Sequence, residues 1–202
     1  MKKKEVVFDV ETQKLFSDIA TQNPGDLKIS VVSAYTRLVD EKQNETKGKM
    51  YSFWVDNLNG LWDLFSVADR IIGFNTISFD IPALQPYAPY SLAKLKHFDM
   101  HDEIRKTLGR RIGLAALAKE TLGTDKTDVG TNAVIYWQRG DKNSLEKLRK
   151  YCEADVLLTR DLYDHVLRTQ KLKYIDKWNN PREFEVDFSY PEGEDESQIG
   201  LF

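Results

Sequence analysis

Two carboxylates interrupt an apolar run near the start of the chain. The segment Val6–Thr12 has the pattern of a buried β-strand, yet it carries Asp9 and Glu11. Successive strand residues point to opposite faces, so positions 9 and 11 share one face, about 7 Å apart. Two buried ionised carboxylates are costly unless a cation balances them, and hard oxygen ligands favour Mg²⁺ or Mn²⁺. The alternative is a strand end with both side chains in solvent.

Asp80 follows a second apolar strand, predicted over Arg70–Asn75. It precedes Ile81 and Pro82, where a helix is predicted to begin. In open α/β sheets the ligand crevice forms at the carboxyl ends of the strands, which favours a functional role for this carboxylate. Capping the helix is the alternative role.

Asp155 interrupts the apolar face of a long helix predicted over Ser144–Arg168. Residues three and four apart share one side of a helix, and a leucine would be the default at this position. The stripe consists of Leu148, Tyr151, Cys152, Asp155, Leu158, Leu162 and Val166. Tyr151 lies one turn before Asp155, so its hydroxyl projects toward the same place. A hydrogen-bonded core tyrosine is the alternative.

Three segments together resemble a known family. They are Phe8–Thr12, Asn75–Asp80 and Tyr151–Asp155, which resemble in order and spacing the three exonuclease motifs of the DEDD 3′–5′ exonuclease superfamily. The similarity is to its tyrosine branch, on the ribonuclease H-like fold, and extends over about residues 4 to 170. The chain looks most similar to the exonuclease domains related to the proofreading domain of family B DNA polymerases. The histidine branch would carry a histidine where this chain has Lys150.

This resemblance implies a 3′–5′ exonuclease acting on DNA in repair or proofreading, with RNA as the nearest alternative substrate. It implies that Asp9, Glu11, Asp80 and Asp155 hold two Mg²⁺ or Mn²⁺ ions, and that Tyr151 orients the attacking water. Two such ions can stabilise both the attacking and the leaving oxygen of a phosphodiester. The residues that the resemblance assigns to the path of the terminal nucleotides are Thr12, Leu15, Phe16, Asn75 and Phe79.

The order of the predicted elements gives an α/β fold, a ribonuclease H-like mixed five-stranded sheet flanked by helices. Strands are predicted at Lys4–Val10, Lys28–Val39, Lys49–Val55, Arg70–Asn75 and Leu95–Phe98. Besides the long helix, helices are predicted at Leu61–Ala68, Ile112–Leu122 and Thr131–Gln138. The polar loop Asp40–Gly48 is expected to join the second and third strands as a hairpin. After the long helix, Lys171–Lys177 is expected to lead into an extended segment.

Some side chains have two open roles. Asp99 ends the fifth strand and is either an accessory group of the metal site or a cap of the next helix. The aromatic residues Phe16, Tyr87, Tyr90, Tyr136 and Trp137 either stack on unpaired bases or pack in the core. Basic residues that either bind nucleic acid or line solvated helix faces are Arg105, Lys106, Arg110, Arg111, Lys119, Lys126, Arg139 and Lys142.

Composition agrees with one domain over residues 1–177 and a tail over 178–202. A chain of 202 residues with 41% hydrophobic residues can bury one full core. The formal net charge of −3 does not exclude nucleic acid, because a binding surface is local. A single cysteine, Cys152, and the absence of a long apolar stretch predict a cytoplasmic protein without a membrane span.

The tail has an acidic linker, from Pro191 to Ser197, followed by five residues that end in Leu201 and Phe202. The end resembles the short Gln-x-x-Leu-Phe peptides that dock on the bacterial sliding clamp, with Gln198, Leu201 and Phe202 at the matching positions. Folding back onto the domain as a terminal staple is the alternative.

Two other function classes fit the same motifs. One is a catalytically silent nucleic-acid-binding or adaptor module on the ribonuclease H-like fold. The other is an endonuclease, whose cleft would have to accept internal phosphates. Circular single-stranded DNA distinguishes an endonuclease from an exonuclease.

Overall fold

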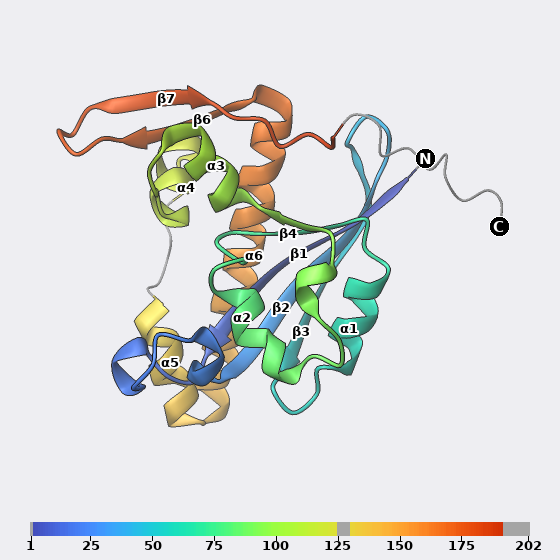
Figure 1. The fold of residues 1–202 in the computed structure, drawn as a ribbon, viewed down its shortest axis with the longest axis vertical. Helices are drawn as coiled ribbons and strands as arrows, with labels where there is room; N and C mark the ends of the chain where they lie inside the picture. The colour runs from blue at the N-terminus through green and yellow to red at the C-terminus, as the bar shows by residue number, and fades with distance from the viewer. Residues whose placement is uncertain (1, 125–129, 192–202) are drawn as a thin grey trace.

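A mixed five-stranded sheet forms the centre of the fold (Figure 1). The computed structural model describes residues 2–124 and 130–191. The strands are β1 Lys3–Thr12, β2 Ile29–Val39, β3 Glu45–Trp54, β4 Arg70–Gly73 and β5 His97–Asp99, in the order β3-β2-β1-β4-β5. The first three strands run antiparallel, and β4 and β5 run parallel to β1. The predicted α/β fold class is confirmed.

Helices cover both faces of this sheet. They are α1 Asn59–Ser66, α2 Asp80–Leu84, α3 Met100–Leu108, α4 Leu114–Leu122, α5 Gly130–Arg139 and α6 Lys142–Thr169. Alternation along β1 assigns the faces: Val6 and Phe8 pack in the cluster that includes α1 and α2, whereas Val7 packs with residues of α3 and α6. Asp9 and Glu11 share the face of Val7, so they are directed toward α6. No helix within the described residues has both the length and the apolar character needed to cross a membrane.

Strand β3 begins four residues earlier than predicted, at Glu45. It pairs with β2 from Glu45 opposite Val39 to Trp54 opposite Val31. The first half of β3 is exposed at the edge of the sheet, so its polar side chains carry no apolar alternation. Backbone pairing with β2, rather than its own sequence pattern, keeps this segment extended.

The packed domain continues past the boundary expected at residue 177. Strands β6 Lys171–Ile175 and β7 Pro181–Glu185 form an antiparallel hairpin, so residue 178 lies in its turn. After the hairpin, Val186 and Phe188 are buried in the core cluster of α3 and α6. The physical reason is apolar burial, because Phe188 is 1% exposed. Residues 192–202, which include Gln198, Leu201 and Phe202, lie outside the described residues.

A buried charged network joins the last described residues to the start of the sheet. Glu5 accepts hydrogen bonds from Arg37 Nε at 2.8 Å and from the Tyr190 hydroxyl at 2.8 Å. Arg37 also makes a two-pronged pair with Asp164 of α6 at 2.8 and 2.6 Å. The guanidinium of Arg70 lies 3.5 Å from the centre of the Tyr190 ring. Glu5 and Arg37 are thus paired, and Arg70 donates hydrogen bonds to the Tyr163 hydroxyl and the Phe188 and Ser189 carbonyls.

Candidate metal centre

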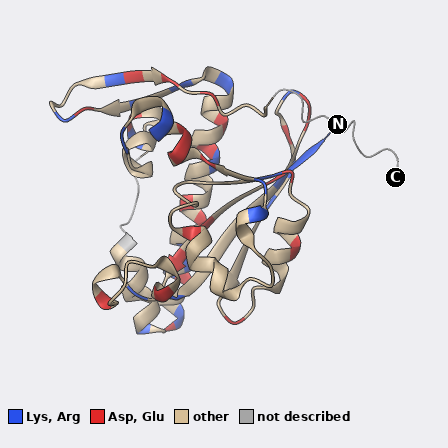
Figure 2. Cartoon of the chain, viewed as in Figure 1, with Lys and Arg blue, Asp and Glu red and all other residues tan. Residues whose placement is uncertain are grey.

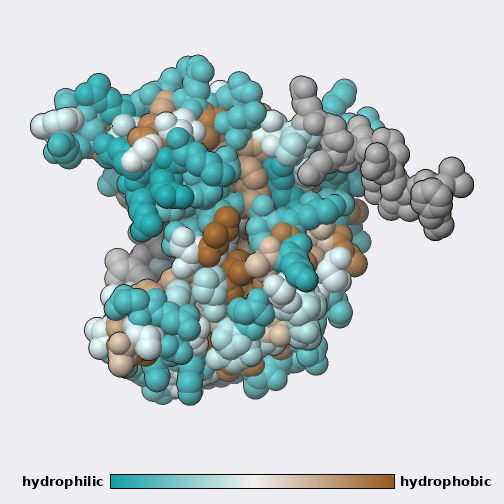
Figure 3. Space-filling model, viewed as in Figure 1, coloured by the Kyte–Doolittle hydropathy of each residue, from teal (hydrophilic) through white to brown (hydrophobic). Residues whose placement is uncertain are grey.

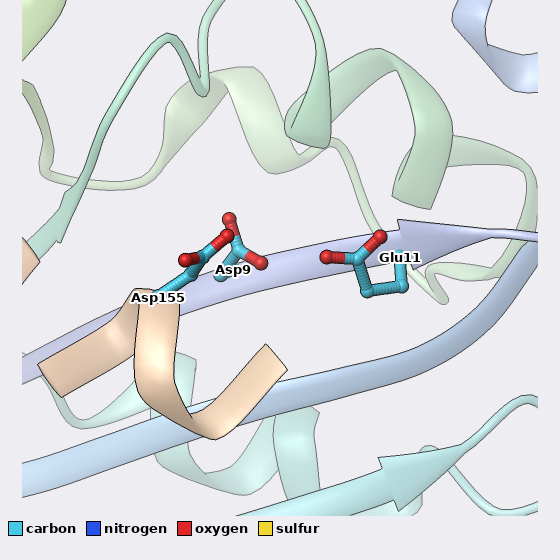
Figure 4. A group of neighbouring side chains, drawn as sticks. All are labelled: Asp9, Glu11 and Asp155. Atoms are coloured by element: carbon cyan, nitrogen blue, oxygen red, sulfur yellow. The ribbon is translucent and has the colours of Figure 1, made fainter. Parts of the chain in front are cut away.

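Three carboxylates from two elements meet at the carboxyl end of β1. Asp9 and Glu11 come from β1 and Asp155 from the middle of α6, and the three groups point toward one another (Figure 4). Each offers a carboxylate oxygen within 4.8 Å of those of the other two. Asp155 is buried, and the other two are partly exposed. Hard oxygen ligands at this spacing suit a divalent cation such as Mg²⁺ or Mn²⁺.

The buried face of α6 delivers Asp155 to this place. The helix turns its predicted stripe toward the sheet, and Leu148, Cys152 and Leu162 are completely buried. Asp155 lies in the same stripe at 6% exposure. The carboxylate at this core position therefore faces the carboxylates of β1.

Tyr151 lies one turn before Asp155 and makes a side-chain hydrogen bond with it. Burial raises the pKa of the Tyr151 phenol, and the negative charges of Asp155, Glu11 and Asp9 raise it further. The hydroxyl therefore stays protonated and donates to Asp155. The sequence left two roles open for Tyr151, a group of the site and a hydrogen-bonded core tyrosine. The residue has features of both, because the charges of all three carboxylates act on its hydroxyl while only 7% of the residue is exposed.

Asp80 contacts β1 through the backbone, between the two strand carboxylates. Its Oδ1 accepts a hydrogen bond from the Val10 N–H at 3.0 Å. Strand β4 pairs with β1 only as far as Val7, so this N–H has no strand partner on the β4 side. Burial raises the pKa of Asp80 to about 8, and the nearby charge of Asp99 adds to that increase. Asp80 is outside the group of three carboxylates, and its carboxylate lies beside the edge of the strand that carries two of them.

Asp99 fixes the turn that leads to Asp80. It caps α3 by accepting hydrogen bonds from His101 N at 2.9 Å and Asp102 N at 3.3 Å. It also accepts from Asn75 N at 2.8 Å and Ile77 N at 2.9 Å. The capping role is therefore confirmed. The link to residues 75 and 77 was not predicted, because no local pattern connects the two segments.

Cys152 packs behind Asp9. Its Sγ lies 3.4 Å from the Asp9 carbonyl oxygen and 3.7 Å from Oδ2. Burial raises the pKa of this thiol, so it remains a neutral weak donor. The sequence predicted a buried small side chain here but gave no signal for the contact with Asp9.

Comparison with known families agrees with this geometry. A family model described as RNase_H superfamily matches residues 6–167, which include the three carboxylates and Asp80. The chain belongs to the RNase_H superfamily. A search of curated proteins gave no match. Membership in the RNase_H superfamily indicates a nuclease-type fold whose acidic group is suited to divalent cations.

Two loops of this RNase_H superfamily domain bring apolar side chains to the rim of the site. Phe16, after β1, meets Phe79, before α2, edge to face with ring centres 6.1 Å apart. Leu15 and Phe16 are 36% and 38% exposed. Asn75 adopts a left-handed backbone, φ +67°, in the turn that Asp99 fixes.

The remaining nucleotide-path and aromatic candidates are mostly engaged elsewhere. The Thr12 hydroxyl donates to the Lys14 carbonyl at 2.9 Å, and the residue is only 7% exposed. Tyr90 donates to the Trp62 carbonyl at 3.1 Å, in the cluster around α1. Trp137 stacks on Trp54 with ring centres 6.3 Å apart. Core packing therefore accounts for Tyr90 and Trp137.

A partly apolar pocket of about 550 Å³ adjoins α2. It is lined by Ile77, Ile81, Pro82, Gln85, Ala93, Leu95 and His97. Figure 3 shows apolar atoms gathered in a hollow near the middle of this face of the molecule. The lining includes Ile81, the residue that follows Asp80 in the chain, and none of the four carboxylates.

Proposed function

We propose that this protein is a divalent-metal-dependent 3′–5′ exonuclease of the tyrosine branch of the DEDD superfamily. Its substrate is the 3′ end of DNA, single-stranded or frayed, and its role is in DNA repair or proofreading. The observation that carries the proposal is the meeting of Asp9, Glu11 and Asp155 with the Tyr151 hydroxyl at one end of β1. RNase_H superfamily membership supports a nuclease, and the ordered motifs support the branch and the polarity.

In this proposal Asp9, Glu11 and Asp155, with Asp80 from the second motif, hold two Mg²⁺ or Mn²⁺ ions. Bound there, the ions would supply an acidified water and stabilise the leaving oxygen. The substrate phosphate is anionic, so positive ions are needed to stabilise its charge during cleavage. Four carboxylates can hold two such ions. Asp80 is held neutral by burial in the metal-free protein, so its participation requires the release of a proton.

Tyr151 orients the attacking water in the proposed mechanism. Its protonated hydroxyl donates to Asp155 and keeps lone pairs that can accept a hydrogen bond from water. A raised phenol pKa makes proton abstraction by the tyrosine unfavourable, which is why its part is positioning. The exposed side chains of Leu15 and Phe16 offer apolar contacts for the bases at the 3′ end.

The test is the cleavage of 5′-labelled linear single-stranded DNA in Mn²⁺, resolved nucleotide by nucleotide. The expected result is a ladder that shortens from the 3′ end, while circular DNA of the same sequence resists. The double variant Asp9→Asn with Asp155→Asn is expected to be inactive. Asp161→Asn, which also removes a carboxylate from α6 but at an exposed position, is the matched control and keeps its activity.

Four results would contradict the proposal in different ways. No ladder with any DNA or RNA would favour the silent adaptor module. Linearised circles would favour an endonuclease, and a ladder with RNA alone would favour an exoribonuclease. Equal rates for the double variant and its parent would remove the carboxylates from the chemistry.

We also propose that the terminal peptide binds a sliding clamp through Gln198, Leu201 and Phe202. Tyr190 is held beside Glu5, about 20 Å along β1 from Glu11, so a chain leaving there starts far from the carboxylates. Deletion of residues 198–202 is expected to abolish clamp binding and to leave both the melting temperature and the cleavage of short oligonucleotides unchanged. Lower stability without clamp affinity in the parent would contradict this.

A further inference from the structure

The β6–β7 hairpin carries an exposed tryptophan at its tip. Trp178 is 68% exposed, the largest exposure of any large apolar side chain among the described residues. The hairpin projects from the end of α6 past α4, toward the same side of the molecule as the end of β1 (Figure 1). Nothing in the proposed chemistry uses this hairpin, and an exposed tryptophan there has no role in the core.

The turn that presents Trp178 is firmly built. Asp176 accepts hydrogen bonds from Trp178 N and Asn180 N, both at 2.9 Å, and from Arg182 Nε at 2.8 Å. These hydrogen bonds lower the pKa of Asp176 to about 2, and the bond from the Asn180 N–H has the largest effect. Asn179 adopts the left-handed backbone that such a turn requires, with φ at +62°. The backbone that carries the ring at the tip is therefore held in a defined conformation.

The base of the hairpin is fixed to the domain. Thr121 of α4 donates to the Lys173 carbonyl at 3.3 Å and accepts from Lys173 N at 3.0 Å. The Tyr174 and Phe184 rings meet edge to face with centres 5.8 Å apart, and the Arg110 guanidinium lies 4.8 Å from the Tyr174 ring centre. Strand β6 thus joins the exposed tip to the basic loop after α3.

The hairpin differs in charge from the chain as a whole. Residues 171–185 contain four basic and three acidic residues, whereas the whole chain has a formal net charge of −3. Arg110 and Arg111 lie in the loop next to it, and Figure 2 shows basic residues on both the hairpin and this neighbouring layer. The Lys177 ammonium lies 4.4 Å from the Trp178 ring centre. Lys126, another basic candidate, lies outside the described residues. An aromatic ring beside cations is the combination that binds an unpaired, anionic nucleic-acid strand.

We propose that this hairpin, with Arg110 and Arg111, binds the substrate strand on the 5′ side of the reacting 3′ end, with Trp178 stacked on an unpaired base. The inference rests on the proposed function, because it takes its ligand from that function. It adds a second contact with the substrate strand, made by residues outside the three sequence motifs. A stacking contact is tolerant of sequence, as an exonuclease requires.

The distance between the two contacts sets the length of strand required. Asp155 is about 20 Å from the end of α6, at 1.5 Å per residue. The hairpin adds about 15 Å and extends to one side of the helix rather than along it (Figure 1). The tip is then about 25 Å from Asp155, which corresponds to about seven nucleotides at a spacing of 3.4 Å and to fewer in a more extended strand. A strand of four nucleotides is too short to engage both contacts unless it is greatly extended.

Binding is measured first, in EDTA, so that no cleavage occurs. The full chain is titrated into labelled 16-nucleotide single-stranded DNA and followed by fluorescence anisotropy. Trp178→Ala is expected to weaken binding by at least about fivefold, the lower end of the range for base–aromatic stacking. Trp178→Phe is expected to retain most of the affinity. Val67→Ala is the matched control, because Val67 is 54% exposed at the end of α1, away from the hairpin.

A second measurement compares cleavage of 16- and 4-nucleotide strands in Mn²⁺. The ratio of kcat/KM for the long strand over the short strand is expected to fall about fivefold in Trp178→Ala and to stay at the parent value in Val67→Ala. DNA is also expected to quench tryptophan fluorescence in the parent more than in Trp178→Phe.

Equal dissociation constants for the parent, Trp178→Ala and Val67→Ala would overturn the proposal. So would self-association of the parent that is lost in Trp178→Ala, because the tip would then be an interface between copies of the chain. Failure of the proposed function is a separate result. In that case no strand is cleaved in Mn²⁺, although binding in EDTA still depends on Trp178.

Discussion

Asp155→Asn is expected to stabilise the metal-free protein while it weakens metal binding. The change removes one of three negative charges that lie within 4.8 Å of one another. At that separation two unit charges repel by about 3.5 kcal/mol at an effective dielectric constant of 20, and by about 1 kcal/mol in water. Asparagine keeps the shape of the side chain and can still accept the hydrogen bond from Tyr151.

The magnitude follows from the two repulsive pairs that Asp155 makes. Asp9 and Glu11 are partly exposed and therefore screened by solvent, so we use the water limit of about 1 kcal/mol for each pair. The expected gain in the free energy of unfolding is therefore about 2 kcal/mol. In a domain of this size that corresponds to a melting temperature higher by about 4–8 °C.

The assay is thermal unfolding in EDTA and again in excess Mn²⁺. A ligand that binds only the folded protein raises its melting temperature, so Mn²⁺ is expected to stabilise the parent clearly and the variant much less. Asp161→Asn is the control for the loss of one charge on α6, since Asp161 pairs with Arg160 at the surface. That control is expected to show no stabilisation in EDTA and the full response to Mn²⁺.

A melting temperature for Asp155→Asn in EDTA at or below that of the parent would refute the electrostatic reasoning. An undiminished response to Mn²⁺ would refute the assignment of Asp155 as a ligand. Because the two readouts are independent, either part of the reasoning can fail alone.

Three further predictions follow from buried polar groups. Arg37→Ala leaves the completely buried Glu5 without its cation and is expected to lower the free energy of unfolding by about 3–5 kcal/mol in urea titrations, and a loss below about 1 kcal/mol would contradict this. Asp80 has a pKa raised to about 8, so its contribution to stability in metal-free protein is present below about pH 4 and is lost as the pH rises toward 8. The gain of Asp80→Asn over the parent in urea titrations should therefore grow from pH 5 to pH 8, and a constant difference would show that the carboxyl is not held protonated. Tyr151→Phe is expected to lower kcat by about 10²–10⁴ with a melting temperature within a few degrees of the parent, and unchanged turnover would remove the hydroxyl from the mechanism.

Local periodicity predicted which way the carboxylate side chains of the site point. The alternation along β1 fixed Asp9 and Glu11 on one face, and the helical stripe of α6 fixed the inward side of Asp155. Both predictions need only the residue period of one strand or one helix, which can be read directly from the sequence of that element. The meeting of the three carboxylates then required only that α6 pack on the correct face of the sheet.

Features made by distant segments could not be predicted in this way. Glu5 looks like a solvated residue at the start of a strand, and it is buried because Arg37 and Tyr190 pair with it from positions 32 and 185 residues away. An extended segment was expected after Lys171–Lys177, but the pairing of β6 with β7 as a hairpin was not predicted, for a related reason. Its strands are polar and mostly exposed, so cross-strand pairing and the turn at Asp176 define them instead of an apolar alternation.

The two ends of the described chain touch, since the Lys3 ammonium lies 3.7 Å from the centre of the Tyr190 ring. A short linker could therefore join them, and new ends could be opened at the exposed turn between β2 and β3, around residues 41–43. Such a circular permutant would keep every strand of the sheet intact. It would also test which contacts fold first, because β1 and β7 would become neighbours in sequence and the pairing of β2 with β3 would become long-range.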